Sequence, residues 1–453
     1  MFLRAAPNGH AGRVDGCRGR AVFGHACGSD GTYRSLPLAA GRTALTVAAV
    51  LVILTTNTIF GQPSEQLSAG ATAQPVYLIV TTRTLEPAVA ALAQYRRTDG
   101  FDVVVSTQQP GEAIAALKAG GKHPAMLLLV GDDESGMEKQ PWYVPAKRLR
   151  QFRWMPSRQK ATYACDSAWG DLDGDGLPDI PVGRIPARDK SQVKQVVDKI
   201  LAYEATPPGP SDRAVPIWAG SPCYSSEIDA MATGILLSTL SASAPVWMEP
   251  WVMSADPGHP LCGVPQEQPE RWGRRLGQGG AMAIYIGHGD ENSLYAMEYQ
   301  RRDIRFTGDH VRQFLSNGPP APPMLMICCL TASFAQSEPC LGELLLFAPG
   351  GPVAAIGATA QSHPLPNYFT GVRLLWAAGQ GPQRLGTLWL EVGKKANEDR
   401  AMLIERLLQN VEGVVADVDL PKLRRDQMLI YELLGDPALK LRLPESQPTT
   451  PSR

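Results

Sequence analysis

The sequence predicts an α/β protein with a mostly parallel sheet, and three features of the chain lead to this prediction. Short runs of apolar and β-branched residues alternate with helix-forming segments from residue 76 to residue 443. Proline and glycine separate these segments. The 453 residues are 44% hydrophobic, which is enough to bury both faces of such a sheet.

The first predicted subdomain covers residues 76–206. Its expected elements alternate in this order: strand 76–80, helix 84–95, strand 101–105, helix 113–119, strand 126–130 and helix 191–205. The last helix is the clearest of them, because its apolar residues recur at helical spacing and form one stripe: Val193, Val196, Val197, Ile200 and Leu201.

A proline-rich break at 206–210 (TPPGP) ends this helix and marks the boundary to a second subdomain at 211–443. The elements expected there are strand 215–219, helix 228–240, strand 281–286, strand 324–328, helix 341–347, strand 353–356 and strand 439–443. Residues 444–453 are polar and predict a loose tail.

The residues before the domain have the layout of an export signal. Residues 1–42 form a basic lead with six arginines against two aspartates, and 43–60 contain a short apolar core. This core is shorter than the roughly 20 residues that a membrane-spanning helix needs. We therefore predict a cleaved signal and a linker at 61–75, with an uncleaved membrane anchor and a buried helix as alternatives. Both the signal and the anchor predict a secreted or cell-envelope protein.

Composition and missing motifs exclude several functions. The 43 basic and 44 acidic residues nearly cancel, so we expect no nucleic-acid partner. None of the eight cysteines belongs to a Cys-x-x-Cys pair, which disfavours a zinc ribbon. The chain has no Gly-x-Ser-x-Gly elbow of a serine hydrolase, and no glycine fingerprint of a dinucleotide-binding site follows the first strand.

Two predicted strands end in reactive side chains. Strand 281–286 runs into Gly287 and His288, and strand 324–328 runs into Cys329. Ligands of open α/β sheets bind at the carboxyl ends of strands, so a thiol and an imidazole meet there if these strands are neighbours. The imidazole would favour the nucleophilic thiolate and later protonate the leaving amine.

Backbone N–H groups complete this predicted site, and simpler interpretations compete with it. The N–H groups of Gly289 and Cys329 are placed to stabilise an oxyanion. Cys328 lies inside the apolar run and is interpreted as a small buried hydrophobe. By the same logic Cys329 would be a core residue, and His288 a structural residue in a glycine-rich turn.

The segment 285–292 (YIGHGDEN) resembles the catalytic histidine motif of the gingipain-type cysteine peptidases, family C25. The segment 329–334 (CLTASF) and the helix after it resemble the nucleophile motif of that family, although Ala332 often has glycine as its counterpart. Further similarity, in the same order along the chain, is found at 170–184, 350–359 and 434–441.

The resemblance implies a caspase-like, three-layer α/β/α fold with two subdomains. It also implies a cysteine endopeptidase that acts on protein or peptide substrates, with Cys329 rather than Cys328 as the nucleophile. The alternative is a catalytically silent caspase-like module that binds partners at the cell surface. A membrane contact is expected only through the N-terminal segment, if that segment stays as an anchor.

Specificity residues follow from the same resemblance. Gingipain-type enzymes prefer a basic residue before the scissile bond and hold it with an acid, for which Glu227 is the first candidate and Asp229 the second. Each could instead cap the following helix from the surface. His363 falls where the family builds a pocket wall. Glu291 is the candidate that orients His288, and Asp290 is its alternative.

An acidic loop at 171–182 predicts a partial calcium site. Four aspartates occupy positions 1, 3, 5 and 9 of a calcium-loop pattern: Asp171, Asp173, Asp175 and Asp179. Gly176 stands at position 6, but Val182 replaces the usual glutamate at position 12. Calcium here would have a structural role, because thiol chemistry needs no metal. The alternative is a solvated acidic turn.

Overall fold

The computed structural model describes residues 74–151, 162–223, 226–381, 383–398 and 420–443. The predicted basic lead at 1–42, the apolar segment at 43–60 and the tail at 444–453 lie outside these residues, as does all of the predicted linker except its last two residues. Among the described residues, no helix is both long enough and apolar enough to span a membrane.

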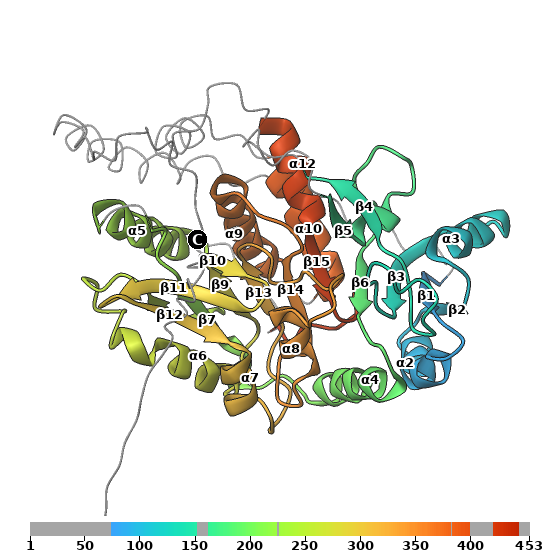
Figure 1. Ribbon diagram of the computed structural model, residues 1–453, viewed down its shortest axis with the longest axis horizontal. Coiled ribbons are helices and arrows are strands. Elements are labelled where there is room, and N and C mark those ends of the chain that lie inside the picture. Colours follow the sequence, from blue (N-terminus) through green and yellow to red (C-terminus); the bar gives the residue numbers. More distant parts are fainter. Residues whose placement is uncertain (1–73, 152–161, 224–225, 382, 399–419, 444–453) are drawn as a thin grey trace, which may run out of the picture. The chain divides into compact units, whose positions relative to one another are not determined.

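A ten-stranded sheet organises the described chain, in the order β2-β1-β3-β6-β15-β14-β13-β9-β7-β8 (Figure 1). The first four strands form one parallel block: β1 (Val76–Thr81), β2 (Asp102–Ser106), β3 (Pro124–Val130) and β6 (Val182–Ile185). A second parallel block consists of β7 (Ala214–Ala219), β8 (Glu249–Ser254), β9 (Ala283–Ile286), β13 (Met324–Ile327) and β14 (Ala355–Ala358). Between the blocks lies β15 (Tyr431–Leu434), antiparallel to β14.

Helices cover this sheet in two series (Figure 1). One series contains α2 (Glu86–Thr98), α4 (Lys190–Ala205), α6 (Gln268–Leu276), α7 (Gly308–Phe314) and α8 (Leu341–Phe347). The other contains α3 (Pro110–Ala119), α5 (Ser226–Ser243), α9 (Pro364–Ala378), α10 (Leu385–Glu398) and α12 (Leu420–Ile430). The predicted three-layer α/β/α fold with a mostly parallel sheet is confirmed.

The strand sequences are apolar because both faces of the sheet are buried. In β1, Tyr77 and Ile79 belong to the large core, whereas Leu78 and Val80 belong to a second core that includes residues of α3. A strand covered on both faces needs no alternation with polar residues. Complete burial of these side chains therefore explains the continuous run that predicted the first strand.

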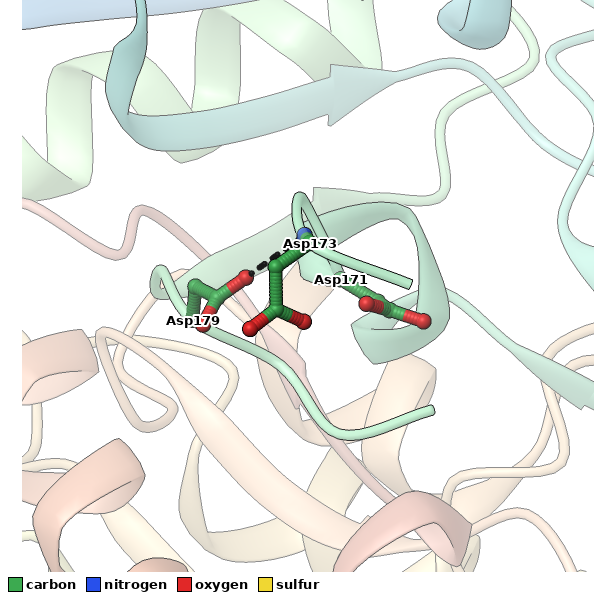
Figure 2. Close-up of side chains that lie close together, drawn as sticks. All are labelled: Asp171, Asp173 and Asp179. Atoms are coloured by element: carbon green, nitrogen blue, oxygen red, sulfur yellow. Dashed lines mark hydrogen bonds between the residues drawn. The ribbon is translucent and has the colours of Figure 1, made fainter. Parts of the chain in front are cut away.

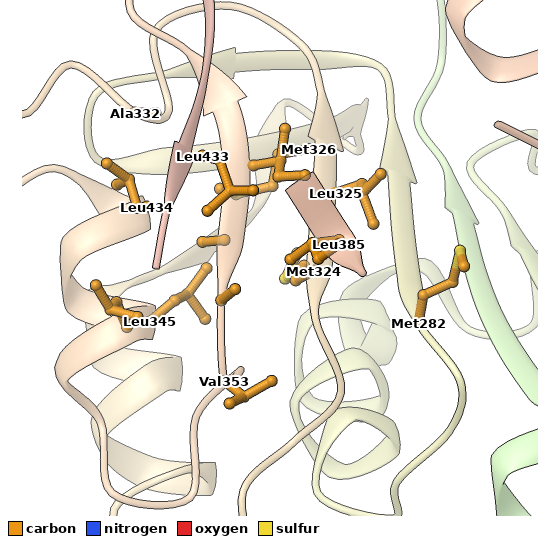
Figure 3. Close-up of a cluster of buried hydrophobic side chains, with 14 of the residues drawn as sticks. Met282, Met324, Leu325, Met326, Ala332, Leu345, Val353, Leu385, Leu433 and Leu434 are labelled. Atoms are coloured by element: carbon orange, nitrogen blue, oxygen red, sulfur yellow. The ribbon is translucent and has the colours of Figure 1, made fainter. Parts of the chain in front are cut away.

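The strand that leads to Cys329 lies within the large hydrophobic core (Figure 3). Met324, Leu325 and Met326 of β13 are at most 1% exposed. They belong to the same buried cluster as Leu345 of α8 and Leu433 of β15. Each fully buried side chain of this size contributes about 1.5–3 kcal/mol relative to an exposed one. The end of β13 is therefore a rigid support for the residues that follow it.

One predicted strand was wrong. Residues 439–443 form only an isolated bridge, between Lys440 and Arg384, and the last strand of the sheet is β15 at 431–434. A short apolar run could belong to either segment, and the pairing with β14 decides between them.

Sequence reasoning also missed smaller elements. A two-stranded sheet pairs β4 (Lys147–Arg150) with β5 (Thr162–Cys165). A three-stranded antiparallel sheet consists of β10 (His288–Asp290), β11 (Ser293–Tyr299) and β12 (Arg302–Thr307). These strands are short and partly polar, so the apolar pattern does not reveal them.

Candidate active site

The strands β9 and β13 lie side by side and end together. They are parallel, with Ile286 opposite Ile327 as the last pair of the register. The N–H of Gly287 donates to the carbonyl oxygen of Ile327 at 3.3 Å. His288 and Cys329 each stand two residues beyond that last pair, so both leave the sheet at the same edge. The strands are thus neighbours, as the predicted dyad requires.

Gly289 brings the chain after His288 against the loop that contains Cys328 and Cys329. A Cβ atom at this position would lie 2.7 Å from the sulfur of Cys328 and 3.0 Å from the carbonyl oxygen of Cys329. These distances are shorter than side-chain carbons tolerate, so a residue larger than glycine would push the two segments apart. The oxyanion role of the Gly289 N–H stays a prediction.

The imidazole of His288 is oriented by a backbone carbonyl. Its Nε2 atom lies 3.1 Å from the carbonyl oxygen of Pro222, in the loop that follows β7. A carbonyl can only accept, so Nε2 carries the proton and donates it. Nδ1 is then left with a lone pair that can receive a proton from a thiol.

Cys329 is lifted out of the sheet by a strained turn. The next residue, Leu330, has a φ of 63°, which non-glycine residues rarely adopt and which costs about 1–2 kcal/mol. Its N–H donates to the carbonyl oxygen of Ala360 at 3.1 Å, which holds the turn in place. The Cys329 side chain is only partly buried, and its sulfur lies 3.7 Å from both the hydroxyl and the carbonyl oxygen of Ser362.

The two adjacent cysteines have different environments. The Cys328 side chain is fully buried, and burial raises its pKa well above the usual range of a thiol. A thiol that stays protonated is a poor nucleophile. The structure thus supports the interpretation of Cys328 as a core residue and leaves the partly exposed Cys329 as the candidate for chemistry.

The two acids beside His288 have other contacts. Asp290 accepts from the hydroxyl of Ser293 at 2.9 Å and forms an ion pair with Arg305 at 2.8 Å. The backbone oxygen of Glu291 accepts from the N–H of Leu341, at the start of α8. Both acids line an open hollow beside β10. An orienting role for Glu291, or for Asp290, stays a prediction.

The three candidate substrate-binding residues lie in two segments. Glu227 and Asp229 belong to the first turn of α5, where the structure describes the backbone but not these side chains. His363 is buried directly before α9, and its N–H donates to the side-chain oxygen of Gln427 at 3.4 Å. It follows Ser362, which contacts the Cys329 sulfur. The role of His363 in a pocket wall stays a prediction.

The acidic loop brings three of its four predicted carboxylates together (Figure 2). Carboxylate oxygens of Asp171, Asp173 and Asp179 lie within 4.8 Å of one another. Asp175 is not in this group, and its carboxylate accepts from the N–H of Leu177 at 2.8 Å. The donor set is therefore suited to a hard cation, but with a smaller side-chain contribution than predicted.

Sequence reasoning missed two contacts of this site. Pro222 acts through its backbone oxygen, which any residue type provides, so its identity carries no signal. Ser362 follows the strand β14 and contacts the sulfur across a loop. The rule that ligands bind at the carboxyl ends of strands could have found both, because β7 and β14 also flank the reactive pair.

The family model of peptidase family C25 matches residues 71–442. Among curated proteins, Lys-gingipain of Porphyromonas gingivalis is 23% identical over 225 residues, which is 49% of this chain. The match covers 12% of the length of that relative.

Solved structures show the same fold. The crystal structure of the Arg-specific cysteine proteinase gingipain R (RgpB) has a TM-score of 0.58 and 19% identity, with 82% of this chain and 78% of that chain covered. The complex of the Porphyromonas gingivalis RgpB pro- and mature domains also has a TM-score of 0.58, at 18% identity, and covers 81% and 80%.

Proposed function

This chain belongs to peptidase family C25, and we propose that it is a cysteine endopeptidase in which Cys329 is the nucleophile and His288 transfers the proton. One observation carries the proposal: the register of β9 and β13 delivers both residues to one edge of the sheet. The protonated Nε2 of His288, bound to the Pro222 oxygen, turns Nδ1 into the base.

The reaction follows from these positions. The Cys329 proton moves to His288, and the thiolate attacks the scissile carbonyl carbon, so that a C–S bond forms and the carbonyl oxygen becomes an oxyanion. Backbone N–H groups of Cys329 and Gly289 stabilise that oxyanion. The C–N bond then breaks while His288 protonates the leaving amine. Water hydrolyses the thioester, which releases the acid and restores the thiol.

The finer features of the enzyme are part of the same proposal. Two relatives are named for lysine and arginine specificity, which favours cleavage next to a basic residue, with Glu227 or Asp229 as its partner. Export through the N-terminal segment is proposed from its signal-like layout. Asp171, Asp173 and Asp179 are proposed to hold a structural Ca²⁺, together with backbone or water oxygens.

The test is active-site labelling of the full chain with an iodoacetamide-type electrophile, followed by mass spectrometry, together with cleavage of a peptide library. An active enzyme should label at Cys329, lose that labelling in His288→Ala and cleave peptides. A silent binding module should show no His288-dependent labelling at Cys329, and this result would refute the proposal. The library would also show whether a basic residue precedes the cleaved bond.

A further inference from the structure

Ser362 contacts the sulfur of Cys329 but has no part in the Cys–His reaction described above. Its hydroxyl and its carbonyl oxygen both lie 3.7 Å from that sulfur, within the range of hydrogen bonds to sulfur. The residue stands between β14 and α9, next to a group of polar side chains from three elements. Hydrogen-bond directions within this group determine where the Ser362 proton points.

The directions begin at a backbone amide. The N–H of His363 can only donate, and it donates to the side-chain oxygen of Gln427 on α12. This contact fixes the Gln427 amide, because its oxygen must face His363 and its NH₂ group must face the other way. That NH₂ group donates to the side-chain oxygen of Asn367 on α9.

Asn367 is fixed by a second donor as well. The hydroxyl of Tyr431, at the start of β15, donates to the same Asn367 oxygen at 2.8 Å. Burial raises the pKa of Tyr431 well above its usual range, so this hydroxyl keeps its proton. Two donors on the Asn367 oxygen leave its NH₂ group facing Ser362, whose hydroxyl oxygen lies 3.0 Å away.

Ser362 therefore accepts from Asn367, and its own proton can go to either of two neighbouring acceptors, the Tyr431 hydroxyl oxygen or the Cys329 sulfur. We propose that the Ser362 hydroxyl donates a hydrogen bond to the Cys329 thiolate, and that Asn367, held by Gln427 and Tyr431, is the positioning residue that fixes this direction. The inference rests on the proposed function, because the thiolate is the reactive form of the nucleophile. All donors in this chain point toward the sulfur, so their dipoles add up at the charge.

This series of hydrogen bonds fits each stage of the proposed reaction. In the resting thiol, the S–H can donate to the Ser362 carbonyl oxygen. After the proton has moved to His288, the sulfur can only accept, and the Ser362 hydroxyl becomes its partner. No member of the chain gains or loses a proton. Of the groups near the sulfur, Cys328 and Tyr431 stay neutral because burial raises their pKa values, and Asp290 is paired with Arg305.

The backbone around Ser362 is held by a residue outside the second predicted subdomain (211–443). The side-chain NH₂ of Gln151, directly after β4, donates to the carbonyl oxygen of Gln361 at 2.5 Å. The preceding carbonyl, of Ala360, accepts from Leu330. These contacts hold the segment on both sides of the sulfur, so a lost hydroxyl at Ser362 should leave the backbone in place.

The experiment measures the rate of Cys329 alkylation by iodoacetamide between pH 5 and pH 9 in the full chain, with the site quantified by mass spectrometry. Ser362→Ala should move the half-maximal pH up by about one unit, which is about tenfold in rate on the acidic side. Ser362→Thr restores a hydroxyl and should return within about twofold of the original rate. With a cleavable peptide, Ser362→Ala should lower kcat about tenfold and leave KM unchanged.

Asn367→Asp tests the donor-to-acceptor direction of these hydrogen bonds while the side chain keeps its size and shape. A carboxylate can accept from Gln427 and Tyr431 but cannot donate to Ser362, whose proton would turn toward the aspartate. It should therefore reproduce the shift of Ser362→Ala. Thr370→Val is the matched control, because this buried hydroxyl of the same helix donates to the Pro366 carbonyl, at 2.9 Å, and not to the group around Ser362. Its alkylation profile should match that of the unmodified chain.

Two results would overturn the proposal. An unchanged pH profile in Ser362→Ala, with labelling that still depends on His288, removes the hydroxyl from the mechanism and leaves the peptidase assignment intact. A shift in Ser362→Ala that Ser362→Thr does not reverse shows a packing effect instead of a hydrogen bond. Failure of the peptidase assignment is seen separately, as His288-independent labelling of Cys329 before any change at Ser362.

Discussion

The carboxyl ends of two strand pairs in this sheet are built in opposite ways. One of them is the pair β3 and β6. There Arg184 of β6 is fully buried and binds Asp166 through two contacts, at 2.5 and 2.7 Å. The same guanidinium donates to the carbonyl oxygens of Gly131 and Val144 at 2.6 and 2.9 Å. The Arg184 guanidinium thus has all of these partners inside the protein, and we call this region the ion-paired end.

At the end of β9 and β13 the two side chains are partly exposed. His288 and Cys329 are half-buried, and they contact carbonyl and hydroxyl oxygens of Pro222 and Ser362. In the proposed mechanism, charges form on the thiol and the imidazole of this thiol end when a proton moves from sulfur to nitrogen.

The difference shows what each end can do. A permanent buried charge needs a permanent partner, because an unpaired charge in the interior costs several kcal/mol. Such a pair is rigid and has no capacity for a ligand. A transient charge needs adaptable dipoles around an open position, which is the arrangement at the thiol end. The comparison predicts that the two ends fail differently when residues are changed.

The largest effect is expected at the thiol end, on activity. Cys329→Ala removes the nucleophile and should leave no measurable peptide cleavage, and His288→Ala should lower cleavage about a thousandfold. Both variants should melt within a few degrees of the unmodified chain, because neither side chain is part of the buried core. Peptide hydrolysis and circular dichroism measure the two properties.

Cys328→Ala is the matched control for this prediction. It removes a neighbouring thiol that is buried and protonated, so peptide cleavage should continue. Near-normal cleavage by Cys329→Ala, or by His288→Ala, would contradict the dyad.

At the ion-paired end the effect should fall on stability. Arg184→Met leaves Asp166 buried without its partner, so the free energy of unfolding should drop by about 3–5 kcal/mol. Urea unfolding measures this loss. The control is Arg213→Ala, which breaks an ion pair with Glu249 whose side chains are 49% and 62% exposed and should cost less than about 1 kcal/mol. Equal losses in the two variants would show that burial does not set the difference.

Glu343, on α8, should make stability depend on pH. Burial, with the nearby Asp132 carboxylate, raises the pKa of Glu343 from 4.5 to about 8. Between these values the folded state keeps a proton that the unfolded state has released, so stability should fall as the pH rises, by about 1.4 kcal/mol per pH unit. Above pH 8 this dependence should end.

Glu343→Gln should flatten that dependence, since it removes the titrating group and keeps an acceptor for the Cys340 N–H, which donates to Glu343 at 2.9 Å. Urea unfolding of both chains at pH 5, 6.5 and 8 provides the comparison. The same slope in the glutamine variant would assign the pH dependence to other groups.

The smallest effect is expected at the acidic loop. If Ca²⁺ binds there, chelation should lower the melting temperature by a few degrees, as for the loss of a ligand worth about 2–3 kcal/mol. Asp173→Asn should abolish the response to chelator, whereas Asp175→Asn should keep it, because the Asp175 carboxylate lies outside the cluster. A melting temperature that chelation does not change would remove the calcium proposal.

The predictable part of this fold is the part that hydrophobicity encodes locally. Strands such as 76–80 and the helix 341–347 were found because burial of both sheet faces leaves a continuous apolar pattern. The polar strands of β10 to β12 and the true last strand were missed, since partners far away in the chain decide their pairing.

By itself the sequence determined the fold class, because this depends on runs of adjacent residues. It also predicted the two strand ends that carry His288 and Cys329, and its resemblance to a family favoured Cys329 over Cys328. Only the tertiary structure decided which atoms meet: the Pro222 oxygen at His288, the Ser362 hydroxyl at Cys329 and three of the four loop aspartates. The first two contacts join loops that are tens of residues apart, and their geometry arises when the sheet brings those loops to one edge. The aspartates belong to one loop, whose backbone conformation decides which carboxylates converge.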